Sequence, residues 1–144
     1  MIAVAALGPD DREAWQTLFA GYNAFYGRSW PAERYEQAWQ TFMRAETMHA
    51  LGGRLDGRLV GIAHFLVHPS TTSADLCYLQ DLFTDPDVRG RGVGRSLIEA
   101  VSAWAADQGC ARLYWHTQRH NDAARRLYDQ LGEHRDFIVY TRQL

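Results

Sequence analysis

The chain has 144 residues, 47% of them apolar, which suits one ordinary domain with a single core. Fifteen basic and seventeen acidic residues give a formal charge of −2, a balance that favours neither nucleic acid nor an anionic membrane as a partner. No apolar run approaches the roughly 18 residues of a membrane span, and no signal-like segment opens the chain. We therefore expect a cytoplasmic protein.

The basic residues are all arginine, because the chain contains no lysine. This excludes a nucleotide triphosphate loop of the Gly-Lys type and any lysine Schiff base. Cys77 and Cys110 lack paired-ligand spacing and are expected to be free thiols. His116 and His120 fall in a strand and the loop after it with no third ligand nearby, so we expect no metal site.

The first 44 residues predict a strand and two helices. Residues 1–6 form a candidate strand, and the turn at 8–11 offers Asp10 or Asp11 as a helix cap. Apolar residues at helical spacing from 15 to 26 predict the first helix. A second helix is expected to start near Pro31, which suits a first turn, and to run to about residue 43.

From residue 47 the hydrophobic period becomes that of strands. Residues 47–55 and 58–67 are apolar stretches joined at Asp56-Gly57, a strong hairpin signal. A polar turn follows, and residues 76–83 complete an antiparallel meander.

The second half of the chain alternates helix and strand. A helix is expected from Val93 to about residue 109, a strand at 112–117, a short helix between Asn121 and Gly132, and a last strand at 137–142. Asn121 is a candidate cap for the short helix. The whole chain, residues 1–144, is thus expected to form one mixed α+β domain around a single sheet.

A glycine-rich and arginine-rich turn separates the third meander strand from the helix at Val93. Its glycines let backbone N–H groups approach a ligand closely, and the helix start adds unpaired donors and a positive dipole end. These features predict a phosphate site. A dinucleotide fingerprint fails, because Arg95 stands where its third glycine belongs.

Two motifs stand out in this chain, Arg89-x-x-Gly92-x-Gly94 and the segment from Asn121 to Gly132, and both resemble motifs of the GCN5-related N-acetyltransferase (GNAT) superfamily. Arg89-x-x-Gly92-x-Gly94 is similar to the family's coenzyme A pyrophosphate motif, and the segment from Asn121 to Gly132 resembles its second motif. The resemblance covers almost the whole chain. Residues 78–83 and 22–26 look most like the polyamine and histone acetyltransferase-like branch.

The resemblance implies a mostly antiparallel twisted sheet flanked by about four helices. It also implies a V-shaped opening between the strands at 76–83 and 112–117, where acetyl-CoA lies. Backbone groups of Phe83 and Thr84 would pair with the pantetheine arm, and amides from Arg91 to Ser96 would hold the pyrophosphate. The expected acetyl-CoA contacts are Phe83, Thr84, Arg89, Gly90, Arg91, Gly92, Val93, Gly94, Arg95, Ser96 and Asn121.

The resemblance also assigns catalytic roles. Tyr128 would donate a proton to the departing thiolate, and a backbone N–H near Leu82 or Phe83 would stabilise the carbonyl oxygen. Polyamine acetyltransferases commonly carry Leu-Glu-Asp at the end of this strand, whereas this chain has Gln80, which cannot accept a proton. Asp81 remains the candidate base, directly or through water; its alternatives are to bind a cationic amine or to cap a turn.

An acceptor pocket is expected between the two N-terminal helices and the strand ends. Its candidate substrate-binding residues are Tyr22, Phe25, Tyr26, Trp30 and Gln80, with Asp81 and Glu33 to attract a positive amine. His64 and His68 either reach this pocket or pack in the core.

These features predict an acetyl-CoA-dependent N-acetyltransferase that acts on the primary amine of a small cationic molecule by direct attack in a ternary complex. Two alternatives stay open: a protein lysine or N-terminal acetyltransferase, and a non-catalytic acyl-CoA-binding module. Dimers are common among proteins that this chain resembles, so a homodimer is one candidate assembly, although the sequence does not define the oligomeric state.

Overall fold

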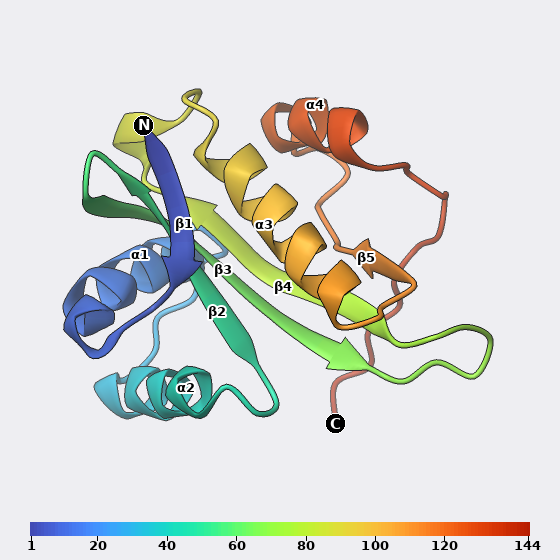
Figure 1. The fold of residues 1–144 in the computed structure, drawn as a ribbon, viewed down its shortest axis with the longest axis horizontal. Helices are drawn as coiled ribbons and strands as arrows, with labels where there is room; N and C mark the ends of the chain where they lie inside the picture. Colours follow the sequence, from blue (N-terminus) through green and yellow to red (C-terminus); the bar gives the residue numbers. More distant parts are fainter.

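One five-stranded sheet with strand order β1-β2-β3-β4-β5 organises the protein (Figure 1). The computed structural model describes residues 1–144. The first four strands pair antiparallel with their neighbours, and β5 joins β4 in parallel. The strands are β1 (Ile2–Ala6), β2 (His49–Leu55), β3 (Arg58–His68), β4 (Leu76–Thr84) and β5 (Arg112–Tyr114).

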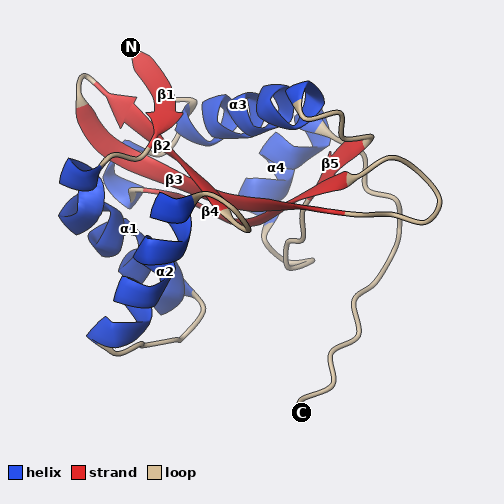
Figure 2. Cartoon of the chain, turned by 60° about the horizontal axis from the view of Figure 1, so that its bottom comes forward, coloured by secondary structure: helices blue, strands red, loops and turns tan.

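Helices cover both faces of this sheet. Figure 2 shows α1 and α2 on one side and α3 on the other, and Figure 1 places α4 beyond β5, beside the start of α3. The helices are α1 (Arg12–Phe25), α2 (Ala32–Arg44), α3 (Val93–Asp107) and α4 (Asp122–Leu131), with single 3-10 turns η1 (Pro9–Asp11) and η2 (Pro86–Val88). This arrangement confirms the mixed α+β class predicted from the sequence. None of these helices is long and apolar enough to span a bilayer.

Two clusters of buried side chains fill the space on either side of the sheet. The cluster under α1 and α2 is rich in aromatic residues, including Trp15, Phe19, Tyr35, Trp39 and Phe42. The cluster under α3 is mostly aliphatic, including Val60, Val93, Leu97, Ile98 and Val101. The hydrophobic spacing of each helix predicted these faces.

Two positions in the meander require glycine, one for a turn with positive φ and one for a close approach of α3. Asp56 and Gly57 adopt φ values of 51° and 85°, as a two-residue hairpin turn requires, so the predicted hairpin is confirmed. At Gly61 an added Cβ would lie only 2.7 Å from a methyl carbon of Val93. Glycine at this position lets the start of α3 pack tightly on β3.

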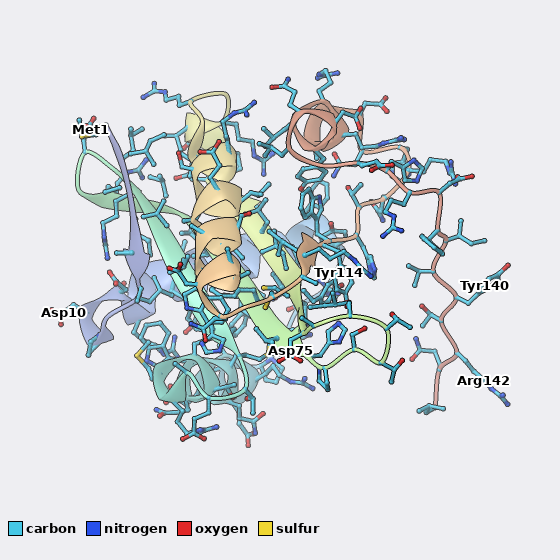
Figure 3. The ribbon with its side chains drawn as sticks, turned by 45° about the vertical axis from the view of Figure 1, so that its right-hand side comes forward. Met1, Asp10, Asp75, Tyr114, Tyr140 and Arg142 are labelled. Carbon is cyan, nitrogen blue, oxygen red and sulfur yellow. The ribbon has the colours of Figure 1, made fainter.

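The prediction of a last strand at 137–142 is wrong. Residues 133–144 carry no strand or helix, and Phe137, Ile138, Val139 and Tyr140 are 80%, 61%, 63% and 89% exposed. Figure 3 shows Tyr140 and Arg142 on a segment that runs away from the body of the protein. Strand propensity reflects packing on a neighbouring strand, and this segment has no such neighbour within the chain. The strand before it is also shorter than expected and ends at Tyr114 instead of Thr117.

Neither predicted helix cap forms with its side chain. The Asp11 carboxylate accepts a hydrogen bond from the Gly8 N–H at 2.8 Å and pairs with Arg54, so it ties the turn before α1 to β2. Asn121 stands at the start of α4 but bonds no helix N–H.

Candidate functional site

A cavity of about 650 Å³ opens where β4 and β5 separate. The two strands pair with each other only through residues 76–78 and 112–114; beyond them β4 pairs with β3 alone, and the chain after β5 pairs with no strand. This is the V-shaped opening expected from the sequence. Its lining includes Leu79, Gln80, Leu82, Phe83 and Thr84 of β4, Trp115, His116 and Thr117 after β5, and residues from α1, α3 and α4.

The start of α3 points unpaired backbone donors at one end of this cavity. Gly90 and Gly92 have φ values of 81° and 87°, and Gly92 precedes the helix without any side-chain cap. The Ser96 N–H already donates to the Gly92 carbonyl at 3.0 Å, as the fourth residue of a helix does. The Ser96 amide, which was expected to contact the cofactor, is therefore engaged within the helix, whereas the amides from Arg91 to Arg95 donate to no group of the protein.

Three arginines surround the turn, and they differ in their contacts and in whether they line the cavity. The Arg89 Nε donates to the Thr84 carbonyl at 3.3 Å and its guanidinium lies over the Phe83 ring at 5.4 Å. Arg95 hydrogen-bonds Gln130, which links α3 to α4 across the cavity. Arg89 and Arg95 line the cavity together with Gly90, Gly92, Val93 and Gly94, whereas Arg91 and Ser96 do not.

The free edge of β4 provides further donors and acceptors. The Asp85 N–H donates to the Val60 carbonyl at 2.8 Å, so residue 85 faces β3. Because backbone groups alternate along an antiparallel strand, Phe83 also faces β3, whereas Leu82 and Thr84 face the opening. This corrects the expected pantetheine contact by the Phe83 backbone; its side chain does line the cavity.

Tyr128 and Asn121 line the cavity from the side of α4. The Tyr128 ring packs edge-on against Trp115 with centroids 5.5 Å apart. Burial raises the pKa of the Tyr128 hydroxyl above its ordinary value, and Tyr26 raises it further. The hydroxyl is therefore protonated at neutral pH. The Asn121 side chain lies 3.5 Å from the Thr117 hydroxyl.

The end of the cavity where the acceptor is expected is aromatic. Tyr22, Phe25, Tyr26 and Gln80 line it. Trp30 was expected there as well, but it does not line the cavity. Its ring packs instead against the aromatic cluster under α2, with centroids 5.6 Å from Phe19 and 5.9 Å from Tyr35. Glu33 is exposed and contributes nothing to the lining.

Asp81 lies just behind the wall of the cavity. It is 9% exposed and absent from the lining, while its neighbours Gln80 and Leu82 line the cavity. Gln80 has no partner on β3, because Phe65 pairs with Leu79 and His64 with Asp81. This β-bulge turns Asp81 toward α1, whereas Leu79 packs under α3.

The contact between Asp81 and His64 was not predicted from the sequence. His64 is fully buried, with its Nδ1 2.9 Å from Asp81 Oδ2 and its Nε2 2.9 Å from Trp15 Nε1. A histidine within an apolar strand was the one signal of this contact in the sequence, and it did not identify a partner.

The chain belongs to the acetyltransferase (GNAT) family, whose model matches residues 15–132. It is similar to the D-amino-acid N-acetyltransferase HPA3 of Saccharomyces cerevisiae, with 34% identity over 98% of this chain and 90% of the relative. It is also 30% identical to the aminoglycoside N(6')-acetyltransferase type 1 of Stenotrophomonas maltophilia, over 93% of this chain and 88% of that protein.

Solved structures show the same fold. The aminoglycoside acetyltransferase AAC(6')-Iy in complex with a CoA-based bisubstrate analogue superimposes with a TM-score of 0.87 at 20% identity, over 100% of this chain and 99% of that one. A complex of the same enzyme with CoA also has a TM-score of 0.87 at 20% identity, over 99% of this chain and 95% of that one. Family and relatives together establish an acetyl-CoA-dependent N-acetyltransferase that acetylates amines.

Proposed function

We propose that the enzyme transfers acetyl from acetyl-CoA to the primary amine of a small cationic molecule, by direct attack in a ternary complex. One observation carries this proposal: a single cavity extends from the α3 amides to the aromatic residues of α1. Both substrates can therefore lie side by side within one domain formed by residues 1–144. Relatives named for D-amino acids and aminoglycosides support a small amine as the acceptor.

The cofactor end would bind acetyl-CoA mainly through the backbone. The amides of Val93, Gly94 and Arg95 would receive the pyrophosphate, with Arg89 adding charge. Thr84 and the Asn121 side chain would contact the pantetheine arm.

The chemistry uses two side chains and one backbone amide. When bound, acetyl-CoA supplies a thioester, whose carbonyl carbon the amine nitrogen attacks as the carbon–sulfur bond breaks. Tyr128, kept protonated by burial, would give its proton to the sulfur. The Leu82 N–H, which faces the opening, would stabilise the carbonyl oxygen, and Asp81 would take the proton of the amine.

The acceptor end suits a cation. Tyr22, Phe25 and Tyr26 provide aromatic surface, Gln80 provides an uncharged polar group, and the Asp81 carboxylate lies behind them.

Release of coenzyme A tests the function. The panel of acceptors should contain D-amino acids, polyamines, an aminoglycoside and a lysine peptide. The proposal expects turnover with at least one small amine and a much lower kcat/KM for the peptide. Turnover of the peptide alone would support a protein acetyltransferase, and acetyl-CoA binding without any turnover would support an acyl-CoA-binding module.

We also propose that the enzyme is a homodimer. The segment at 137–140 exposes four large apolar side chains, and β5 is an unpaired edge of the sheet. A second copy would cover such surfaces. Light scattering coupled to size exclusion should give twice the chain mass, and deletion of residues 137–144 should give a monomer. A monomeric full-length protein contradicts this proposal without affecting the acetyl transfer.

A further inference from the structure

A chain of buried polar side chains runs from α1 to the wall of the cavity. Trp15 of α1 and His64 of β3 are both 0% exposed, and Asp81 of β4 follows at 9%. The Trp15 Nε1 lies 2.9 Å from one ring nitrogen of His64, and Asp81 Oδ2 lies 2.9 Å from the other. Trp15 and His64 are 49 positions apart in the sequence, and His64 and Asp81 are 17 apart, yet the three side chains meet inside an aromatic cluster.

The chemistry of these groups determines where the hydrogens are. An indole N–H can only donate, so the Nε2 of His64 must accept its hydrogen bond. The ring hydrogen of the neutral imidazole is then on Nδ1, which donates to Asp81 Oδ2. Trp15 therefore selects the tautomer of His64 that holds Asp81 as a hydrogen-bond acceptor.

The packing around the ring leaves it no other orientation. Phe42 stacks on His64 with centroids 4.2 Å apart and planes 24° apart, and Phe19 meets it edge-on at 4.7 Å. Both neighbours are apolar, so Trp15 and Asp81 are the partners that satisfy the two buried nitrogens. An unsatisfied polar atom at this depth would be costly.

Tyr22 connects this chain to the cavity. Its side chain lines the cavity, and its pKa is raised strongly, first by burial and then by the nearby negative charge of Asp81. The Tyr22 hydroxyl is therefore protonated at neutral pH and lies beside the carboxylate. Tyr22 is thus a side chain of the cavity lining on which the charge of Asp81 acts.

We propose that Trp15 and His64 are positioning residues that orient the Asp81 carboxylate, and that the acceptor amine loses its proton to Asp81 through the Tyr22 hydroxyl. This inference rests on the proposed amine acetylation. An ammonium proton of the acceptor passes to the Tyr22 oxygen as the hydroxyl proton passes to Asp81, and the freed nitrogen lone pair forms the bond to the acetyl carbon. As the amide forms, the nitrogen releases its second proton to solvent, and solvent returns a proton to Tyr128 after Tyr128 has protonated the sulfur. Tyr22 ends neutral, and Asp81 gives its proton to water once the product has left.

The tautomer of His64 gives a test that needs no turnover. Ring-nitrogen NMR of the ¹⁵N-labelled ligand-free protein should show the His64 hydrogen on Nδ1, with the signal assigned by its absence from His64→Asn. Trp15→Phe keeps an aromatic ring and removes the donor, so a share of the hydrogen should move to Nε2. A hydrogen on Nε2 in the wild type overturns the proposed chain.

Kinetics of two matched variants test the positioning role. The amide of His64→Asn can still donate near the place of Nδ1, whereas His64→Leu has no donor. We expect kcat to fall about 10- to 100-fold in His64→Leu and only a few-fold in His64→Asn, because misplacing a catalytic group by about 1 Å costs up to 100-fold. The KM for acetyl-CoA should change in neither variant. Equal losses of kcat in the two variants mean that His64 only packs, and contradict the proposal.

Tyr22→Phe tests the connection to the cavity. Its kcat should fall at least 10-fold with an unchanged KM for acetyl-CoA, whereas an unchanged kcat removes Tyr22 from the relay. If His64→Leu and His64→Asn both fail to fold, Tyr22→Phe decides, together with the ring-nitrogen signal of the wild type that changes in Trp15→Phe. Failure of the wild type to acetylate any amine would contradict the proposed function, whereas the wrong tautomer contradicts the positioning chain alone.

Discussion

The two ends of the cavity are built in different ways. The cofactor end consists largely of backbone: the amides at the start of α3, two glycines with positive φ and the free edge of β4. The acceptor end is lined by side chains of α1 and β4, and the buried His64 of β3 and an aromatic cluster lie behind them. Substitutions should therefore separate the two ends, changing acetyl-CoA affinity at one and turnover at the other.

The largest expected effect is at the acceptor end. Asp81→Asn keeps the size of the side chain and removes its ability to take a proton. We expect kcat to fall about 100- to 10,000-fold, the range for loss of a general base. Isothermal titration should give the same acetyl-CoA affinity as the wild type. A matching loss of affinity would mean that the two ends are not separable.

Tyr128 lines the same cavity from α4, and its removal should affect the chemistry more than the binding of acetyl-CoA. Tyr128→Phe should lower kcat about 100-fold by removing the proton donor, with acetyl-CoA affinity nearly intact.

The pH profile gives a further test of the same residue. Because burial raises the pKa of Tyr128 above the ordinary 10.0, the acid stays protonated up to at least that pH. The alkaline decline of kcat in the wild type should thus lie above pH 10.0 and be absent from Tyr128→Phe. An unchanged kcat in the variant excludes the assigned role.

At the cofactor end the backbone itself is the target. Gly92 and Gly57 have φ values of 87° and 85°, so alanine at either position costs about 1–2 kcal/mol of backbone strain. Only Gly92→Ala should also lose acetyl-CoA affinity, about 10-fold, since relief of that strain moves the amides of α3. Gly57→Ala is the matched control, because Gly57 lies in the β2–β3 hairpin, away from the cavity lining. Thermal melts measure the stability of both variants, and titrations measure their affinity for acetyl-CoA.

The smallest expected effect is that of Arg89→Ala. A partly solvated charge contributes on the order of 1 kcal/mol, so acetyl-CoA affinity should fall about 3- to 10-fold with kcat little changed. A change confined to the KM of the acceptor would mean that the turn does not bind the cofactor.

Much of the fold was predictable because its signals are local. The helical spacing of Trp15, Phe19 and Tyr22 indicated the face of α1, and Asp56-Gly57 indicated the hairpin. The segment at 137–142 had equally good strand residues but forms no strand, because a strand depends on a neighbour that local sequence does not specify.

The candidate site divides in the same way. The glycine turn before α3 was recognisable from residue types alone, and the structure places it at the cavity. Asp81 was identified as a candidate, but its contact with His64 depends on the bulge at Gln80, which shifts the β3–β4 register. Trp30 was assigned to the pocket because it is aromatic and nearby in sequence, and packing against Phe19 placed it elsewhere.

The sequence by itself determined that a helix begins after a turn whose glycines leave backbone amides free, because chain conformation and helix polarity are local properties. Only the tertiary structure decided which amides remain unpaired, which β4 groups face the opening, and which partners Asp81 has. These depend on strand register and on side chains brought together from distant positions. Trp15 and His64 are 49 residues apart. Their hydrogen bond selects the tautomer of His64, and burial strengthens that bond because the local dielectric constant is low.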